Sequence, residues 1–345
     1  MVPQGPDPGA PPTRYVKAKA PTDTAHGHPP HSRPIKVHMD YGIVVLDKPS
    51  GPSSHQVAAW ARDAVGAEKA GHAGTLDPKV TGMLVIALDS ATRALDLVRE
   101  AGKEYVTELV LHRDVDRRRL KDVLDRFVGD VIQMPPKRSA VKRALRTRKV
   151  YSIDLLETKG RTALVRVHCE AGTYIRSLCH DIGMALGTGA HMGDLRRTRL
   201  GPFTEEDLVT LQDLRDAAEW HAEDGSEAEL RRIVRPMEDL LADIPSVTIR
   251  DSAVDAVCHG APLAVAGILE VDETVMKGRH AAVLTGKGEA VALGHATMTA
   301  EEMVEAREGI AVQPSRVFMR EGTYPRTWGK ADARKAWMDP GSKDL

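Results

Sequence analysis

The chain has 345 residues, 42% of them hydrophobic, so it can bury a sizeable core in two or three domains and is neither disordered nor fibrous. Its formal net charge of −1 gives no overall attraction to nucleic acids or membranes. Because no apolar run reaches the roughly 18 residues of a membrane span and the N-terminus lacks a hydrophobic signal segment, we expect a soluble protein.

The first part of the chain contains little apolar surface. Residues 1–34 are rich in Pro, Gly, Thr and His, a composition that predicts a disordered tail. A strand at 42–46 follows and ends in a turn-rich stretch, which delivers Lys48 to the end of the strand. Ser53 then opens a helix that Gly66 closes.

Residues 71–78, Gly-His-Ala-Gly-Thr-Leu-Asp-Pro, form the central loop of the chain. The two glycines allow a flat ligand to approach the backbone and permit positive φ angles. Pro78 keeps Asp77 out of the α region, so the carboxylate lies on a short extended segment before an apolar strand at 81–88. An Asp-Pro turn without a chemical role explains the same spacing equally well.

Two further candidate residues lie on regular elements. Alternation from 105 to 111 predicts a strand in which Tyr105 either packs in the core or stacks on a ligand. A hairpin within 150–169 follows, and then a helix from 174 to 186. Arg176 lies near the start of this helix and off its apolar face, where a solvated arginine is also common.

Charge is segregated along the chain although its total is near zero. Residues 133–152 contain seven basic residues and no acid, whereas residues 205–243 contain thirteen acids and four arginines. We expect the basic segment to contact phosphates, and the acidic segment to be helical and to face either protein partners or solvent. The basic residues are Lys137, Arg138, Lys142, Arg143, Arg146, Arg148 and Lys149.

The sequence pattern changes near residue 246. Short β-like runs separated by glycines and charged turns are typical of a small β-barrel. We therefore predict one domain at 35–245, a second at 246–325 and a polar tail at 326–345.

The cysteines favour a reducing environment. They show no Cys-x-x-Cys pair, which argues against a disulfide framework and a zinc ribbon, and the His-Cys and Cys-His pairs at 168–169 and 179–180 match no common zinc motif. We expect a cytoplasmic protein without a bound metal. The cysteines are Cys169, Cys179 and Cys258.

Several motifs resemble, in the same order, those of the TruB-type pseudouridine synthases, over roughly residues 40–325. Residues 71–78 resemble the catalytic motif of that family, and residues 46–49 resemble its first motif. Further similarity lies at residues 102–106, 171–178 and 195–198. The resemblance implies an α+β fold, with a catalytic domain whose central mixed or antiparallel sheet is flanked by helices, and a small β-barrel PUA domain.

Within this family, residues 138–143 and the long C-terminal β domain are similar to the archaeal and eukaryotic branch. Its members are the catalytic subunits of H/ACA ribonucleoproteins, related to dyskerin. The chain lacks the long lysine-rich tails of the eukaryotic members, so we expect an archaeal origin. The resemblance implies as partners an H/ACA guide RNA, rRNA or tRNA, and small accessory proteins, but no membrane.

The resemblance also assigns roles to seven residues. Pseudouridine formation breaks the bond from ribose to N1 of uracil and rejoins the base through C5, so no cofactor is needed. The target must be flipped out of its stack, and one ionised carboxylate acts as nucleophile or base. By resemblance, Asp77 is the nucleophile, Arg176 pairs with it, Tyr105 stacks on the base, Tyr174 and Leu195 wall the pocket, Lys48 supports the first motif and His72 lies where the flipped base leaves its stack.

Three functions follow from these residues. The first is a pseudouridine synthase guided by H/ACA RNA. The second is a stand-alone synthase of the tRNA T-loop, whose PUA domain grips the acceptor end. The third is an RNA-binding scaffold without catalysis, and the presence of Asp77, Tyr105 and Arg176 weighs against it.

Overall fold

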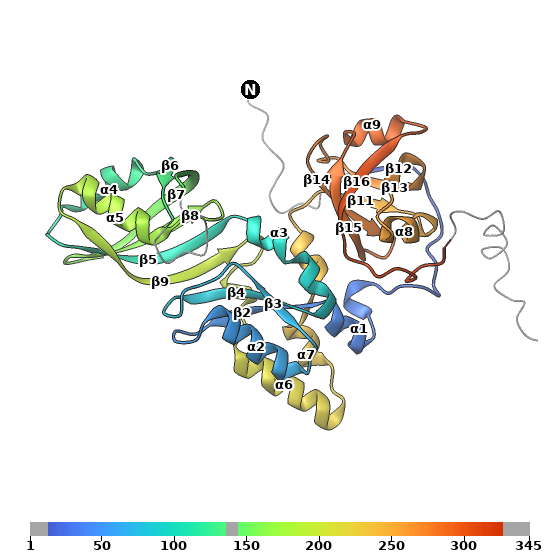
Figure 1. Ribbon diagram of the computed structural model, residues 1–345, viewed down its shortest axis with the longest axis horizontal. Helices are drawn as coiled ribbons and strands as arrows, with labels where there is room; N and C mark the ends of the chain where they lie inside the picture. Colours follow the sequence, from blue (N-terminus) through green and yellow to red (C-terminus); the bar gives the residue numbers. More distant parts are fainter. Residues whose placement is uncertain (1–12, 136–143, 327–345) are drawn as a thin grey trace, which may run out of the picture. The chain divides into compact units, whose positions relative to one another are not determined.

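The structure, a computed structural model, describes residues 13–135 and 144–326 (Figure 1). The chain divides into two compact units. One is continuous from Met39 to Arg235, and the other combines the N-terminal residues up to His38 with the chain from Pro236 onward. The second unit therefore contains N-terminal residues that the sequence did not assign to a domain.

The Met39–Arg235 unit is built on a nine-stranded sheet of order β10-β2-β4-β9-β5-β8-β7-β6, with β3 paired to β4. Among β2 to β9 all pairs are antiparallel except the parallel pair of β4 and β9, so the predicted mixed sheet is confirmed. The strands are β2 (Gly42–Lys48), β3 (Ala70–Ala73), β4 (Thr81–Leu88), β5 (Lys103–Leu111), β6 (Gly129–Gln133), β7 (Arg146–Lys159), β8 (Thr162–Cys169), β9 (Ala190–Leu200) and β10 (Arg235–Pro236).

Helices cover this sheet as the apolar periodicity requires. The helix α2 (Ser54–Val65) begins after Ser53, whose side chain accepts a hydrogen bond from the Gln56 N–H. It ends at Gly66, which has a left-handed φ of 65°. It packs on β3 and against α6, whereas α5 packs on β9 (Figure 1). The helices are α2 (Ser54–Val65), α3 (Leu95–Glu100), α4 (Arg117–Asp125), α5 (Ile175–Leu186), α6 (Leu211–Asp224) and α7 (Ala228–Ile233).

The other unit contains a seven-stranded sheet of order β1-β13-β11-β14-β15-β16-β12. The helix α1 (Ile35–Asp40) leads from this unit into the other one. Of all helices within 13–135 and 144–326, none has the length and hydropathy needed to cross a membrane. The elements are β1 (Arg14–Val16), β11 (Ser246–Ile249), α8 (Asp251–Cys258), β12 (Leu263–Ala264), β13 (Ile268–Asp272), β14 (His280–Thr285), β15 (Ala290–Ala296), α9 (Ala300–Glu305) and β16 (Ile310–Val317).

The prediction of a disordered tail at 1–34 is wrong for residues 13–34. Strand β1 pairs antiparallel with β13, and the Lys17 Nζ donates hydrogen bonds to the carbonyls of Val304 and Ala306, at 2.9 and 2.6 Å. Composition does not reveal that residues 13–34 are ordered, because a short strand that joins an existing sheet edge takes its hydrogen-bond partners from that edge. Residues 1–12 and the predicted tail beyond 326 lie outside the described residues.

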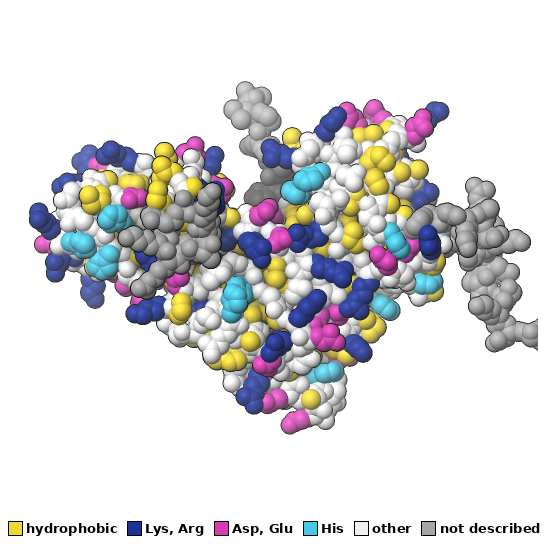
Figure 2. Space-filling model, in the orientation of Figure 1, with side chains coloured by type: hydrophobic (Ala, Val, Ile, Leu, Met, Phe, Trp, Pro, Cys, Tyr) yellow, Lys and Arg dark blue, Asp and Glu magenta, His cyan; other side chains and the backbone are white. Residues whose placement is uncertain are grey.

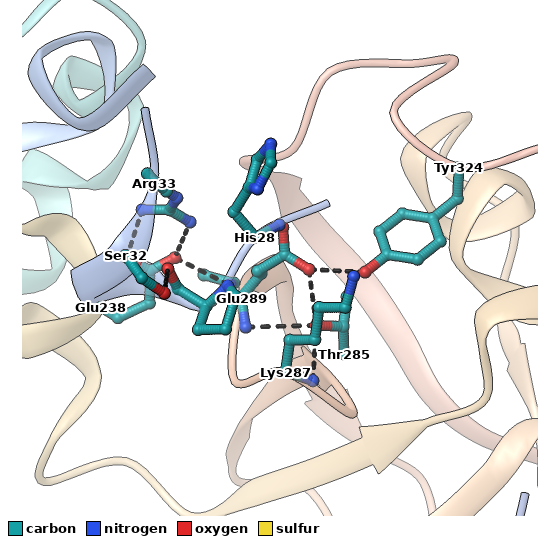
Figure 3. Close-up of polar contacts among 10 residues, drawn as sticks. His28, Ser32, Arg33, Glu238, Thr285, Lys287, Glu289 and Tyr324 are labelled. Carbon is teal, nitrogen blue, oxygen red and sulfur yellow. Dashed lines mark hydrogen bonds and ion pairs between the residues drawn. The ribbon is translucent and has the colours of Figure 1, made fainter. Parts of the chain in front are cut away.

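A buried carboxylate connects the N-terminal segment to the C-terminal part of the same unit (Figure 3). Glu289, 3% exposed, accepts hydrogen bonds from the backbone N–H of His28 at 2.9 Å, the Thr285 hydroxyl at 2.9 Å and the Tyr324 hydroxyl at 2.6 Å. Burial, and then the neighbouring Glu289, raises the pKa of Tyr324, so this hydroxyl stays a donor. One side chain thus joins three separate parts of the unit.

An ion pair holds the next part of the same segment. Arg33 donates two hydrogen bonds to the Glu238 carboxylate, at 2.9 and 2.6 Å, and one oxygen of this carboxylate also accepts from the Ala290 N–H at 2.9 Å. Both side chains are largely buried, so this fork is shielded from solvent.

We predict that Glu289→Ala lowers the free energy of unfolding by about 3 kcal/mol, because three donors lose a buried acceptor. It should also speed proteolysis within residues 13–33. Urea denaturation and limited proteolysis measure these effects. The control is Glu308→Ala, which removes an exposed carboxylate from the same unit and should change stability by less than about 0.5 kcal/mol. Equal stability of the two variants would show that the hydrogen bonds to Glu289 do not stabilise this unit.

Candidate active site

The loop between β3 and β4 presents Asp77. Gly74 adopts a φ of 70°, which only glycine adopts without strain, and the Val80 N–H closes a turn on the Asp77 carbonyl at 3.0 Å. The Asp-Pro turn and the exposed carboxylate are therefore features of the same loop. The side chain of Asp77 is 57% exposed.

Lys48 holds the backbone of this loop through hydrogen bonds. Its side chain is fully buried, and its Nζ donates to the carbonyls of Pro49, Pro78 and Val80 at 2.9, 2.9 and 2.8 Å. Burial lowers the pKa of Lys48, while the negative charge of Asp77 acts in the opposite direction. Lys48 therefore holds the backbone of the loop that presents Asp77.

Arg176 reaches the loop from the first turn of α5. Its Nη2 lies 2.6 Å from the Asp77 Oδ2, and the two side chains are 58% and 57% exposed. The pair is a single hydrogen bond in an open cleft, not a two-pronged fork. It aims the carboxylate while leaving its other oxygen, Oδ1, without a hydrogen bond to the described residues.

Two aromatic residues line the same cleft as this pair. Tyr105 is 8% exposed on the inward face of β5, and burial raises the pKa of its hydroxyl, while the charge of Arg197 acts in the opposite direction. Tyr174 precedes α5, and the side chain of Gln133 holds its backbone by one hydrogen bond to the N–H at 2.9 Å and one to the carbonyl at 3.1 Å. Burial thus restricts Tyr105, and the contacts of Gln133 fix the backbone that carries Tyr174.

His72 lies at the edge of the site. Its Nε2 is 3.1 Å from the Nδ1 of His55, and the two rings meet edge to face. Burial, followed by the charges of His55 and Arg197, lowers the pKa of His72 to about 4. The His72 ring is therefore neutral near pH 7.

These residues line one cleft of about 920 Å³. Six of the seven predicted pocket residues line it, and Lys48 lies beneath. Among the residues that the structure describes, the cleft wall contains one carboxylate, that of Asp77, and five cationic side chains. Such a surface favours a polyanion with a flat group, as RNA is. The cations are Arg62, Arg99, Lys103, Arg176 and Arg197.

Sequence reasoning missed Arg197 as a site residue. It is 1% exposed and donates to the carbonyls of Met83 at 2.8 Å and Gly74 at 3.0 Å, which joins β4 to the central loop. No pattern along the strand marks it, because Arg197 and its neighbour Thr198 are both buried and the burial of Arg197 depends on its pairing with Tyr105 across β9 and β5.

The predicted phosphate-binding segment is only partly described. Arg146, Arg148 and Lys149 lie on β7, where Lys149 is exposed and Arg148 lies 3.5 Å from the Glu170 carboxylate. Figure 2 shows dark-blue Lys and Arg side chains interspersed with magenta Asp and Glu on one face of the molecule. Lys137, Arg138, Lys142 and Arg143 lie outside the described residues.

Comparisons with protein families assign most of the chain. Residues 62–119 and 112–175 match the N-terminal domain of TruB family pseudouridylate synthases, and residues 176–242 match the C-terminal domain of tRNA pseudouridylate synthase B. Residues 245–318 match the PUA domain. Residues 13–58 match the DKCLD (NUC011) domain, which includes the segment that the sequence predicted to be a tail.

Individual proteins are similar over nearly the whole chain. The probable tRNA pseudouridine synthase B of Methanopyrus kandleri is 55% identical over 314 residues, covering 91% of this chain and 93% of the relative. The corresponding protein of Pyrococcus horikoshii is 53% identical over 310 residues, with 90% and 93% covered.

Solved structures show the same similarity in space. A chain of the archaeal box H/ACA sRNP Nop10-Cbf5 complex has a TM-score of 0.84 and 49% identity, with 92% of this chain and 99% of that one covered. A chain of an H/ACA RNP bound to a substrate RNA containing 2′-deoxyuridine has a TM-score of 0.85 and 48% identity, with 93% and 98% covered. Fold and cleft together define an RNA-modifying isomerase. The chain belongs to the TruB family of pseudouridine synthases.

We predict that Lys48→Met lowers the free energy of unfolding by about 3 kcal/mol or more, because three buried carbonyls lose their donor. Chemical denaturation measures the loss. Lys79→Met is the matched control, since Lys79 is an exposed lysine of the same loop and its side chain has no such partners among the described residues. If both variants are as stable as the wild type, Lys48 does not hold the loop.

Proposed function

We propose that this pseudouridine synthase acts as the catalytic subunit of an H/ACA ribonucleoprotein and isomerises a flipped-out uridine selected by a guide RNA. Support comes from its similarity, over more than nine-tenths of the chain, to chains solved within H/ACA complexes. The ion pair of Asp77 and Arg176 in a cleft rich in cations supports catalysis rather than a scaffold role.

Asp77 is the nucleophile or base of the proposed reaction. Its carboxylate attacks the sugar, adds to the base or removes a ribose proton, and Arg176 aims it through a charge-assisted hydrogen bond. Tyr105 stacks on the target base and is a candidate for proton transfer at C5. Because the reaction changes no oxidation state and transfers no external group, the proposal includes no cofactor.

The remaining pocket residues guide the flipped nucleotide. Tyr174 and Leu195 form walls of the pocket, and His72 lies where the base leaves its stack. The neutral His72 ring offers a flat face on which a base can stack. The cations of the cleft offset the phosphate charge of a nucleotide that has left its helix.

RNA and protein partners take different surfaces. We assign phosphate contacts to the basic segment, comprising Arg146, Arg148 and Lys149 on β7 and the four basic residues of 137–143, and we assign the 3′ ACA end of the guide to the PUA domain. One similar chain is solved in a Cbf5-Nop10-Gar1 complex. We propose that small accessory proteins of this kind bind this chain, with the acidic helical residues 205–243 as a candidate contact.

A stand-alone tRNA T-loop synthase is the second candidate. It is favoured by the names of the archaeal relatives, which are 51 to 55% identical and are described as probable tRNA pseudouridine synthase B. For either function we propose a cytoplasmic location, in keeping with three free cysteine thiols at Cys169, Cys179 and Cys258.

We predict that Asp77→Asn abolishes pseudouridine formation while RNA affinity and fold stay nearly unchanged, because the change is isosteric and removes the reactive carboxylate. Single-turnover assays and filter binding measure the two quantities. Asp125→Asn is the control, since it removes an exposed carboxylate paired with Lys121 on α4. If Asp77→Asn keeps a turnover within tenfold of the wild type, the role of Asp77 is refuted. A tenfold change corresponds to a loss of only about 1.4 kcal/mol of transition-state stabilisation.

Guided action makes a separate prediction. The chain alone should modify a free rRNA target poorly, and guide RNA with accessory proteins should restore turnover, because base pairing then selects the uridine and the protein grips only RNA shape and ends. Mapping of pseudouridine in the product RNA measures this. Full activity of the chain alone on a tRNA T-loop, with no binding of guide RNA, would replace the guided function by the stand-alone one.

A further inference from the structure

Lys103 has no role of its own in the scheme above, although it is one of the cations that line the cleft. It begins β5, two residues before Tyr105 on the same face of the strand, and is 6% exposed. Its Nζ donates to the carbonyls of Arg99 at 3.0 Å and Ala101 at 2.8 Å, which are groups at the C-terminal end of α3. The ammonium is therefore fixed in position by backbone acceptors.

Lys103 lies next to Arg197 beneath the central loop. A methyl group built on Gly74 would lie 3.1 Å from the Nη1 of Arg197 and 3.5 Å from the Cε of Lys103. Gly74 precedes Asp77 by three residues, so two buried cationic side chains approach the backbone that presents the reactive carboxylate.

Within residues 13–135 and 144–326, neither cation has a carboxylate at ion-pair distance. Their hydrogen-bond partners are backbone carbonyls. Burial, and then the charge of Arg197, lowers the pKa of Lys103 to about 8. Two unneutralised buried cations are unfavourable on their own, and an anion entering the cleft would relieve that cost.

The reaction supplies such an anion. When the C1′–N1 bond breaks, its electron pair leaves with the uracil ring, whether Asp77 bonds to C1′ or removes a ribose proton. The ring holds that negative charge while it turns. A new C5–C1′ bond then forms from the ring's electrons, while the bond from Asp77 to C1′ breaks or Asp77 returns the ribose proton. The proton on C5 is lost and N1 gains a proton, so Asp77 is regenerated and the product is an isomer of the substrate.

We propose that Lys103, together with Arg197, stabilises the negative charge of the detached uracil ring. Fixed charges in a site shielded from water are worth more than the same charges in solution, because nothing reorganises as the transition state forms. This role rests on the proposed function of Asp77 at the same site and deepens it. It holds for guided and for stand-alone action alike.

A purely structural lysine would behave differently. Lys17 offers a matched control, because its Nζ donates to two carbonyls, of Val304 and Ala306, at the end of α9 in the other unit. Lys17→Met removes the same kind of helix-end contact without changing the charge of the cleft.

The test compares Lys103→Met, Lys103→Arg and Lys17→Met with the wild type as full-length chains, on whichever of the two RNAs the wild type modifies. We expect Lys103→Met to lower the single-turnover rate at saturating enzyme at least tenfold, with RNA affinity within threefold of wild type. Lys17→Met should keep the wild-type rate, although both changes lower stability.

The pH dependence separates charge from packing. The wild-type rate should fall about fivefold between pH 8 and pH 9 as Lys103 loses its proton, and Lys103→Arg should remove this fall. Among the groups that face Lys103 besides Arg197, burial raises the pKa of the Cys169 thiol to about 11 and also raises the pKa of the Tyr105 hydroxyl, so both stay neutral in this range. His72, with a pKa of about 4, does not titrate in this range.

Two results would overturn the role of Lys103. One is a folded Lys103→Met chain with the wild-type single-turnover rate. The other is a Lys103→Arg chain whose rate falls above pH 8 as much as that of the wild type. This second result is decisive if Lys103→Met fails to fold. Loss of guide dependence would refute the function proposed above, but it would leave the comparison among these variants unchanged.

Discussion

The geometry of the cleft depends on the buried ammonium of Lys48. Two of its three acceptors, the carbonyls of Pro78 and Val80, belong to the turn that carries Asp77. A buried cation is unfavourable unless its N–H groups are satisfied, so Lys48 and this turn stabilise each other in one arrangement. Asp77 therefore projects from a fixed backbone although more than half of its side chain is exposed.

The same kind of contact recurs around the cleft. Lys48, Lys103 and Arg197 are all buried, and all donate to carbonyls. A carbonyl satisfies a donor without cancelling its charge, whereas a surface pair such as that of Lys121 and Asp125 is neutral overall. The protein thus retains positive charge around the cleft, which favours an anionic ligand or intermediate.

Local sequence signals predicted the elements that carry the site. The apolar run at 81–88 and the alternation from 105 to 111 predicted β4 and β5, and Ser53 and Gly66 marked the ends of α2. The pairing of Asp77 with Arg176, 99 residues away, came only from the resemblance to a family. The buried positions of Arg197 and Lys103 were missed, because they depend on which strands become neighbours, and spacing along one strand does not show this.

The N-terminal segment raises a different constraint, because it completes a unit whose remainder begins at Pro236. Closing a flexible loop of about 200 residues costs about 5 kcal/mol plus a constant, which the three residues of β1 alone do not offset. The buried contacts of Lys17, Glu289 and Arg33 supply part of the difference. The sheet order removes the remaining cost of closing the loop. Because β10 lies beside β2, the folded catalytic unit brings its own two ends together. We infer that the central sheet forms before the N-terminal segment docks, since only then is the loop already closed.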